Sequence, residues 1–325
     1  MPLTRCSAGR GDRVQTLAEI KAMLELRGLR PRHALGQNFL IDKNLIGKLI
    51  DAAGVEAGEL VLEVGPGTGA LTEALLERGA RVVACELDVQ LAELLSERLA
   101  VALPQSAGRF TLVQADCLGP LSELTGEATT GKTLCKPAVE ALETARAGPG
   151  EKFKLVANLP YGAATPLMLS LLLDHPACVS QAVTIQREVA DRLLAPPGSK
   201  DFGLLGVIAQ SMAEVRLVAK LPPECFWPRP DVTSAMVLLT RRAVPLTADP
   251  RGLASFCQGL FSKRRKQLGS ILGRAVLGPL SPGRVGWPEG VSPQQRPEEL
   301  SVQQFEALRL AIARTTTPFG STLQA

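Results

Sequence analysis

The sequence predicts an α/β protein in which a doubly wound, mostly parallel sheet of seven strands is followed by a small helical domain. Two observations support this prediction. From Leu60 onward, short β-rich runs alternate with helical segments, which is typical of parallel βαβ units. After about Pro245 the β-rich runs stop, and only helical patterns continue. The length of 325 residues suits one large and one smaller domain.

The predicted elements follow in a regular order. Helices at 15–27 and 43–54 come before the sheet, with a basic stretch at 30–33 between them. The first five strands are expected at Leu60–Val64, Arg81–Glu86, Phe110–Ala115, Phe153–Ala157 and Ala182–Gln186, with helices between them such as Ala70–Arg78 and Val89–Val101. Only a loop joins the last two runs, so they are expected to form an antiparallel pair at one edge, near Ala213–Ala219 and Ser234–Thr240.

Three boundaries follow from these patterns. Residues 1–30 form an N-terminal extension, 31–244 hold the sheet, and 245–325 form the helical domain. In the last of these, helical patterns at Leu253–Leu272 and Pro297–Ala313 flank a Gly/Pro-rich connector. Residues 119–150 interrupt the sheet pattern and are rich in Gly, Thr, Ala and Glu, which predicts a mobile insertion.

Composition narrows the functional classes. A net charge of +4 and a pI near 8.7 permit a nucleic-acid partner without requiring one. Seven cysteines without CxxC spacing favour reduced thiols in the cytoplasm over a zinc site or disulfides. Only two histidines, His33 and His175, are present, which excludes a three-histidine metal site and argues against histidine catalysis; no metal is expected. No apolar run reaches the ~20 residues that span a bilayer.

A glycine-rich turn is the strongest local motif. It runs from Glu63 to Gly69 as Glu-Val-Gly-Pro-Gly-Thr-Gly, ends a β-rich run and opens a helix. Such glycines let a backbone approach a ligand closely, although a tight turn without a ligand is the alternative. Glu86 ends the next run, 21 residues after Gly65, where a carboxylate can accept hydrogen bonds from ribose hydroxyls. Asp116 closes the third run, and at this point a nicotinamide nucleotide fits equally well.

The fourth run separates these possibilities, because it leads into Asn158-Leu159-Pro160-Tyr161. The lone pair of an adenine amino group is conjugated with the ring, so transfer of a methyl group to it requires that lone pair to be localised and aimed. The Asn158 amide oxygen and a main-chain carbonyl held by Pro160 can accept its two N–H bonds. Tyr161, the only tyrosine, offers a face for base stacking, worth ~1–3 kcal/mol.

Two further features point to nucleic acid. The proline-fixed segment 225–232 holds Phe226, a candidate second wall for the base. A buried core position is the alternative for Phe226, and Trp227 competes for the role. Four consecutive cations can contact phosphates, or can instead form a solvated helix face: Lys263, Arg264, Arg265 and Lys266. Arg229, Arg241 and Arg242 can add to this field.

Together these residues resemble the ribosomal RNA adenine N6-dimethyltransferase family. The matching segments are 35–40, 63–69, 86–88, 114–116, 158–161, 226–235 and 261–272, in the order typical of the family. The resemblance implies a Rossmann-like S-adenosylmethionine methyltransferase fold, with a helical RNA-binding domain at 245–325. It implies dimethylation of two adjacent adenosines near the end of small-subunit ribosomal RNA, in an assembly intermediate in the cytoplasm. A monomer is expected.

The resemblance also implies roles for individual residues. Tyr161 and Phe226 hold the target base, and Asn158 lies between the base and S-adenosylmethionine. The remaining cofactor contacts come from Asn38, Leu40, Gly65, Glu86 and Asp116.

Three alternatives stay open. A resistance-type methylase of large-subunit RNA has the same site, but segment 35–40 and the helical tail favour the small-subunit enzyme. A DNA adenine methyltransferase is disfavoured because such sites usually carry two prolines or an acid in the fourth-strand motif. A non-catalytic RNA-binding assembly or transcription factor on this fold is disfavoured by the intact Gly65, Glu86, Asn158 and Tyr161.

Overall fold

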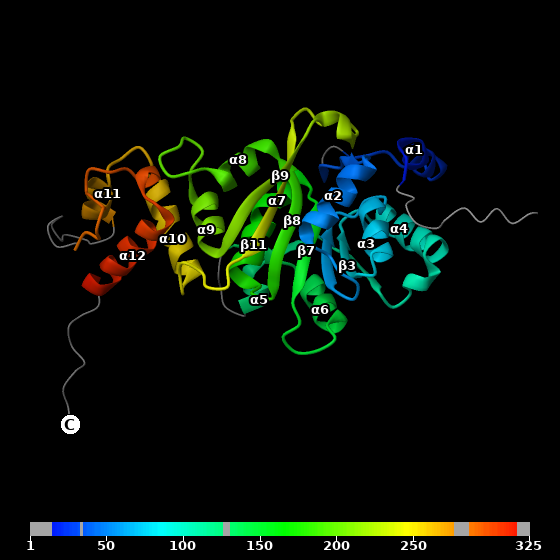
Figure 1. Cartoon of the computed structure of the whole chain (residues 1–325), viewed down its shortest axis with the longest axis horizontal. Coiled ribbons are helices and arrows are strands. Elements are labelled where there is room, and N and C mark those ends of the chain that lie inside the picture. The colour runs from blue at the N-terminus through cyan, green and yellow to red at the C-terminus, as the bar shows by residue number, and fades with distance from the viewer. Residues whose placement is uncertain (1–14, 33–34, 126–130, 276–285, 317–325) are drawn as a thin grey trace, which may run out of the picture.

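A computed structural model describes residues 15–32, 35–125, 131–275 and 286–316. Its central sheet has seven strands in the order β4-β3-β2-β7-β8-β11-β9 (Figure 1). The first five are parallel to one another, whereas β11 runs antiparallel to both β8 and β9. Both predictions, a mostly parallel sheet and an antiparallel edge pair, are therefore confirmed. In spatial order the strands span Phe110–Gln114, Arg81–Glu86, Leu60–Val64, Phe153–Asn158, Cys178–Gln186, Ser234–Arg241 and Ala213–Leu221.

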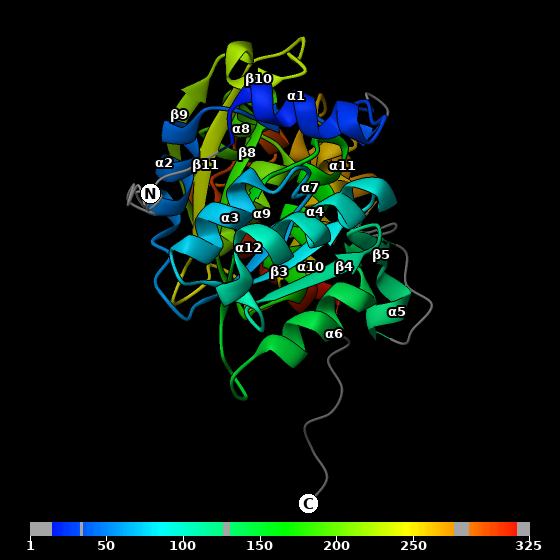
Figure 2. The same ribbon diagram turned by 90° about the vertical axis from the view of Figure 1, so that its right-hand side faces the viewer.

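Helices cover both faces of this sheet. Successive side chains of a strand point to opposite faces, and here the side chains on both faces are apolar. Val61 packs with the helices of one face, and Leu60 and Leu62 pack with those of the other. Around β3 and β4, α4 and α6 lie on opposite sides (Figure 2). The first layer contains α2 (Lys43–Ala53), α3 (Ala70–Glu77) and α4 (Val89–Ala102). The second contains α6 (Lys136–Ala145), α7 (Tyr161–Asp174), α8 (Arg187–Leu194) and α9 (Leu204–Met212).

The order of the strands creates a switch point between β2 and β7. From β2 the chain moves outward through β3 and β4, and it then returns to β7 on the other side of β2. Loops at the carboxyl ends of β2 and β7 therefore diverge to opposite faces of the sheet and leave a crevice between them. Ligands of open α/β sheets bind at such a crevice.

The prediction of a mobile insertion at 119–150 is wrong for residues 131–150, which are ordered. They form β6 (Lys132–Leu134), which pairs with β5 (Leu118–Pro120), and helix α6, which carries the chain back toward β7. Leu134, Ala138 and Leu142 are buried against the sheet. Helix α5 (Leu121–Thr125) precedes this unit, and 126–130 lie outside the described residues.

The C-terminal lobe contains α10 (Pro250–Phe261), α11 (Leu268–Ala275) and α12 (Val302–Thr316), with a 3-10 turn at Pro297–Glu299. It lies at the end of the molecule opposite α1 (Leu17–Leu26) (Figure 1). The single helical pattern expected over Leu253–Leu272 is in fact two helices, because the chain turns at 262–267. The core of this lobe also includes Phe202, Val207 and Ile208, so its apolar packing extends into the segment around α9.

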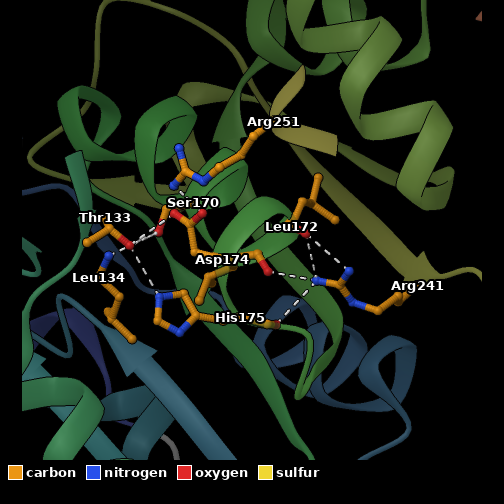
Figure 3. A network of polar contacts seen from close by, with 9 residues as sticks. Thr133, Leu134, Ser170, Leu172, Asp174, His175, Arg241 and Arg251 are labelled. Atoms are coloured by element: carbon orange, nitrogen blue, oxygen red, sulfur yellow. Dashed lines mark hydrogen bonds and ion pairs between the residues drawn. The ribbon is translucent and has the colours of Figure 1, made fainter. Parts of the chain in front are cut away.

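A network of polar contacts ties the lobe to the carboxyl end of α7 (Figure 3). The Asp174 side chain is 3% exposed and pairs with Arg251 of α10. It also accepts a 3.1 Å hydrogen bond from Thr133 of β6. Arg241 donates to the carbonyl oxygens of Leu171 and Leu172, groups that a helix end leaves without partners. Arg241 thus points inward. The prediction that it adds to the positive charge facing RNA is therefore wrong.

Candidate functional site

A cavity of about 310 Å³ lies at the switch point. Its walls come from the loops after β2, β3, β4 and β7 and from the segment before and within β1 (Phe39–Leu40). Among the residues predicted from the sequence, six line it: Asn38, Leu40, Gly65, Glu86, Asp116 and Asn158. The structure therefore brings together residues that lie up to 120 positions apart in the chain.

The glycine-rich loop forms the floor of this cavity and has little room for side chains. Gly65, Gly67 and Gly69 have φ angles of 70°, 56° and 85°, which L-residues rarely adopt. A Cβ at Gly67 would lie 2.7 Å from the ring of Phe39, and one at Gly65 would lie 3.1 Å from the Pro160 ring. Glycine at position 65 lets the loops after β2 and β7 approach each other, and glycine at position 67 makes room for the Phe39 ring of β1.

Glu86 holds this loop in place. Its carboxylate accepts hydrogen bonds from the backbone N–H groups of Gly67, at 3.1 Å, and Asp88, at 2.9 Å. The side chain is 6% exposed, and burial raises its pKa above the ordinary value of a glutamate. The acid thus has a structural contact to the glycine loop in addition to the ligand contact that the sequence predicts.

Glu63 is a cavity residue that the sequence reasoning did not select. It is 1% exposed, and its carboxyl group accepts a 2.7 Å hydrogen bond from Thr72 of α3. Burial is the main cause that raises its pKa to about 8. The sequence did contain a signal for Glu63, because it is the single acid within the apolar strand Leu60–Val64. Acidic side chains are almost never fully buried unless they are paired.

Asn158 ends β7, the strand next to β2, and lines the cavity together with Gly65. Its amide nitrogen donates a 2.8 Å hydrogen bond to the main-chain carbonyl of Asn38. This contact fixes which end of the amide is the nitrogen, because a carbonyl oxygen can only accept. The amide oxygen of Asn158 is thereby left as an acceptor for another group.

Tyr161 follows as the first residue of α7 and is half-buried. Its hydroxyl lies 2.8 Å from the Ser234 hydroxyl at the start of β11. Burial raises the pKa of the phenol, and the Ser234 hydrogen bond opposes that shift. Tyr161 stands beside the cavity and is not one of its lining residues.

Phe226 belongs to β10 (Phe226–Trp227), which pairs with β1. Its ring is 3% exposed and packs in the core with Leu40 and Met236. The predicted role of Phe226 as the second wall for the base is therefore corrected, since its ring turns into the core and leaves almost no surface for a base. Trp227, its competitor, stacks on Phe39 with ring centroids 6.3 Å apart.

Helix α1 covers this aromatic pair from outside. Ile20 and Leu24 are buried against Phe39 and Leu91, both of which line the cavity. Lys21 places its ammonium group 5.6 Å from the centre of the Trp227 ring. The described part of the N-terminal extension is thus packed against the wall of the site. Residues 1–14 and His33 lie outside the described residues.

The basic segment predicted to bind RNA does not form a helix face. It is the turn between α10 and α11, and it exposes Lys263, Arg265 and Lys266. Arg264 points inward, donates to the Ser199 carbonyl at 3.1 Å, and pairs with Glu298. The prediction that Arg264 contacts phosphates is therefore corrected, because its guanidinium is engaged by Ser199 and Glu298. Arg229 is exposed and paired with Glu224, on the loop that precedes β11.

No group of three or more potential metal-binding side chains occurs among the residues that the structure covers. Within the same residues, none of the helices has the length and apolar character that crossing a membrane requires.

Comparisons with known proteins agree with this geometry. Residues 28–309 match the family described as ribosomal RNA adenine dimethylase. The chain is 38% identical to ribosomal RNA small subunit methyltransferase A of Leifsonia xyli subsp. xyli, over 90% of this chain and 96% of that protein. It is also 38% identical to the protein of that name from Mesorhizobium japonicum, over 91% of this chain and 98% of its relative.

Two solved structures share the fold. A dimethyladenosine transferase from Plasmodium falciparum has a TM-score of 0.65 at 20% identity, and the match covers 85% of this chain and 98% of that one. The 23S rRNA methyltransferase ErmE has a TM-score of 0.57 at 24% identity, with 85% and 100% covered.

Proposed function

Because the chain belongs to the ribosomal RNA adenine dimethylase family, we propose that it dimethylates the N6 amino groups of two adjacent adenosines near the 3′ end of small-subunit ribosomal RNA. The observation that carries this proposal is the fixed amide of Asn158. Its nitrogen is held by the Asn38 carbonyl, so its oxygen can accept an N–H of the target amine at the rim of the sheet.

The chemistry of the amine explains why two acceptors are needed. The nitrogen lone pair of adenine is delocalised into the ring and becomes nucleophilic only when the nitrogen turns pyramidal. The amide oxygen of Asn158 and the main-chain carbonyl before Pro160 accept its two N–H bonds in directions that favour that geometry. Once the new bond forms, the nitrogen becomes acidic and its proton can leave to water. A histidine base is therefore unnecessary in this proposal.

S-adenosylmethionine supplies the methyl group on a positively charged sulfur. The glycine loop fits such a ligand, because only glycine allows it to line the cavity in this conformation: a Cβ at Gly67 would clash with the Phe39 ring, and one at Gly65 would crowd the Pro160 ring. We assign Gly65 to the methionine end, Glu86 to the ribose, and Asp116 to the adenine of this cofactor. Asn38 and Leu40 also line the cavity and complete the proposed cofactor contacts.

Tyr161 provides the face on which the flipped base stacks. Phe226 has a supporting role in this proposal, since it pairs with Leu40 of β1 and its buried ring packs in the same core cluster as Leu40. The exposed cations at the α10–α11 turn, Lys263, Arg265 and Lys266, contact RNA phosphates, and Arg229 adds to this surface from the loop before β11. The partner is ribosomal RNA within a small-subunit assembly intermediate in the cytoplasm, and the enzyme acts as a monomer.

One experiment separates this function from its alternatives. Labelled S-adenosylmethionine is offered in parallel to unmethylated small subunits, large subunits and DNA, with the Asn158→Ala variant as the blank. Mass spectrometry is expected to find the label on two adjacent adenines of small-subunit RNA. Label in large-subunit RNA indicates the resistance-type methylase, and label in DNA overturns the RNA assignment. No label in any substrate favours a non-catalytic assembly factor.

A further inference from the structure

Ser234 lies at the edge of the sheet, where the loop 222–233 leads into β11. It is the first residue of β11, is 1% exposed, and pairs with Gln186 at the carboxyl end of β8. Asn158 pairs with Thr184 on that same strand β8. Ser234 therefore lies on the edge that carries Asn158, two strands away in the sheet.

The Ser234 hydroxyl reaches across this edge to Tyr161. The two hydroxyl oxygens are 2.8 Å apart, and either can act as the donor. The phenolic oxygen is the atom of the tyrosine side chain farthest from the backbone, so a bond there fixes the direction in which the ring points. The backbone of Tyr161 is fixed at the other end, because it begins α7 directly after Pro160.

We propose that Ser234 is a positioning residue for methyl transfer, whose hydroxyl holds the Tyr161 ring where the target adenine stacks on it. This inference rests on the proposed function. Ser234 needs no contact with RNA or cofactor to act in this way. Its contribution is preorganisation: a ring free to swing would present its face to the base only part of the time, and turnover is sensitive to errors of ~1 Å in position.

The placement of Ser234 also joins two sides of the site. It follows the loop 222–233, which contains the β10 strand. The hydrogen bond to Tyr161 therefore connects that loop to the Asn158-Leu159-Pro160-Tyr161 segment. Ser180 of β8 differs in this respect, because its buried hydroxyl has no hydrogen-bond partner among the described residues.

The test uses the full-length enzyme with Ser234→Ala, Tyr161→Phe, the double variant, and Ser234→Thr, which keeps a hydroxyl. Ser180→Ala is the matched control, a second buried serine in the same sheet. Small subunits are the substrate, and kcat and KM are measured separately. Tyrosine labelled at Cζ reports the phenol directly by NMR, because Tyr161 is the only tyrosine and gives a single signal.

We expect Ser234→Ala to move the Cζ signal and to lower kcat by about 3–10-fold, which corresponds to the loss of one hydrogen bond. KM should stay within about 2-fold, because phosphate contacts elsewhere dominate RNA affinity. Tyr161→Phe should have the same effect, and the double variant should be no worse than either single one. Ser234→Thr should restore kcat, and Ser180→Ala should change neither readout.

Three results overturn the inference: a wild-type kcat in Ser234→Ala despite a shifted Cζ signal, a Cζ signal that does not move, or additive losses in the double variant. Failure of the proposed function looks different. In that case the wild-type enzyme methylates no small subunits, while the Cζ signal of Ser234→Ala still shifts.

Discussion

The side-chain nitrogen of Asn158 donates a 2.8 Å hydrogen bond to the main-chain carbonyl of Asn38, 120 residues earlier in the chain. Asn158 ends β7, and Asn38 lies next to the short strand β1, so this bond joins two segments that both line the cavity. It also determines that the amide oxygen of Asn158 faces away from Asn38. The N-terminal segment therefore orients the group proposed to hold the target amine.

Asn158→Ala should lower methyl transfer by about 100-fold or more, since the target nitrogen loses one of two directing acceptors. Cofactor affinity should change only a few-fold, because the glycine loop and Glu86 remain. Turnover is measured with small subunits and affinity by calorimetry. Asn44→Ala, on the exposed first turn of α2, is the matched control and should behave like the wild type. Unchanged turnover in Asn158→Ala would remove this residue from the mechanism.

The sequence predicts much of this site because parallel strands place their carboxyl ends on one edge. Glu86 could be selected from its strand end and its spacing from the glycine turn, and Asn158 from its strand end and the Asn158–Tyr161 segment; the bounds of β2 and β3 were predicted to the residue. The Asn158–Asn38 bond could not be predicted, since it depends on a side-chain rotamer and on a contact between distant segments.

Other features escaped prediction for related reasons. Helix α6 was missed because the Gly- and Thr-rich residues before it hide its short apolar pattern. The helical pattern over Leu253–Leu272 continues through the turn that separates α10 from α11. Nothing local marks that break. A contact distant in the sequence accompanies it, since a Cβ at Gly269 of α11 would lie 2.9 Å from Pro293. The inward direction of Arg264 follows from contacts with Ser199 and Glu298, which are distant in the sequence.

Glu63 should make folding depend on pH. Its pKa is about 8 in the folded chain, against a usual value of 4.5, so at neutral pH it is protonated when folded and ionised when unfolded. Unfolding then releases a proton, and stability should fall as pH rises from about 5 to 8, by up to ~1.4 kcal/mol per pH unit from this group. Glu63→Gln should flatten that decline.

Urea unfolding at several pH values measures this effect as the difference in slope between Glu63→Gln and the wild type. Glu140→Gln is the control, because that side chain is 62% exposed on α6 and should leave the slope unchanged. Identical slopes for the wild type and Glu63→Gln would mean that Glu63 is ionised in the folded protein.

Phe226 allows a packing role to be separated from a stacking role. Phe226→Ala should destabilise the protein by about 3–5 kcal/mol, as for other buried aromatic rings. Phe226→Leu should cost less than about 1.5 kcal/mol, because it conserves most of the volume. Since the ring is 3% exposed, we expect the Leu variant to keep its turnover within a few-fold. A stable Leu variant with strongly reduced kcat would instead return Phe226 to the wall of the base pocket.

The exposed cations of the α10–α11 turn should control how RNA affinity depends on salt. Each phosphate contact contributes about 0.7–0.9 to the log–log slope, so replacing Lys263, Arg265 and Lys266 together by Gln should flatten the slope by up to about 2–3. Lys48→Gln, Arg78→Gln and Lys152→Gln, made together, remove the same charge from other exposed positions and should leave the slope nearly unchanged. Fluorescence anisotropy with a small-subunit RNA fragment at several salt concentrations measures both.

Arg264→Gln distinguishes a binding residue from a structural one within the same turn. Its guanidinium contacts the Ser199 carbonyl and Glu298, so its loss should lower the midpoint of urea unfolding and leave the salt slope at the wild-type value. Two results would contradict these roles of the turn cations and of Arg264. Equal slopes in the wild type and the triple-Gln turn variant would make the turn a solvated surface. A flatter slope in Arg264→Gln, without loss of stability, would mean that this arginine turns outward to meet the RNA.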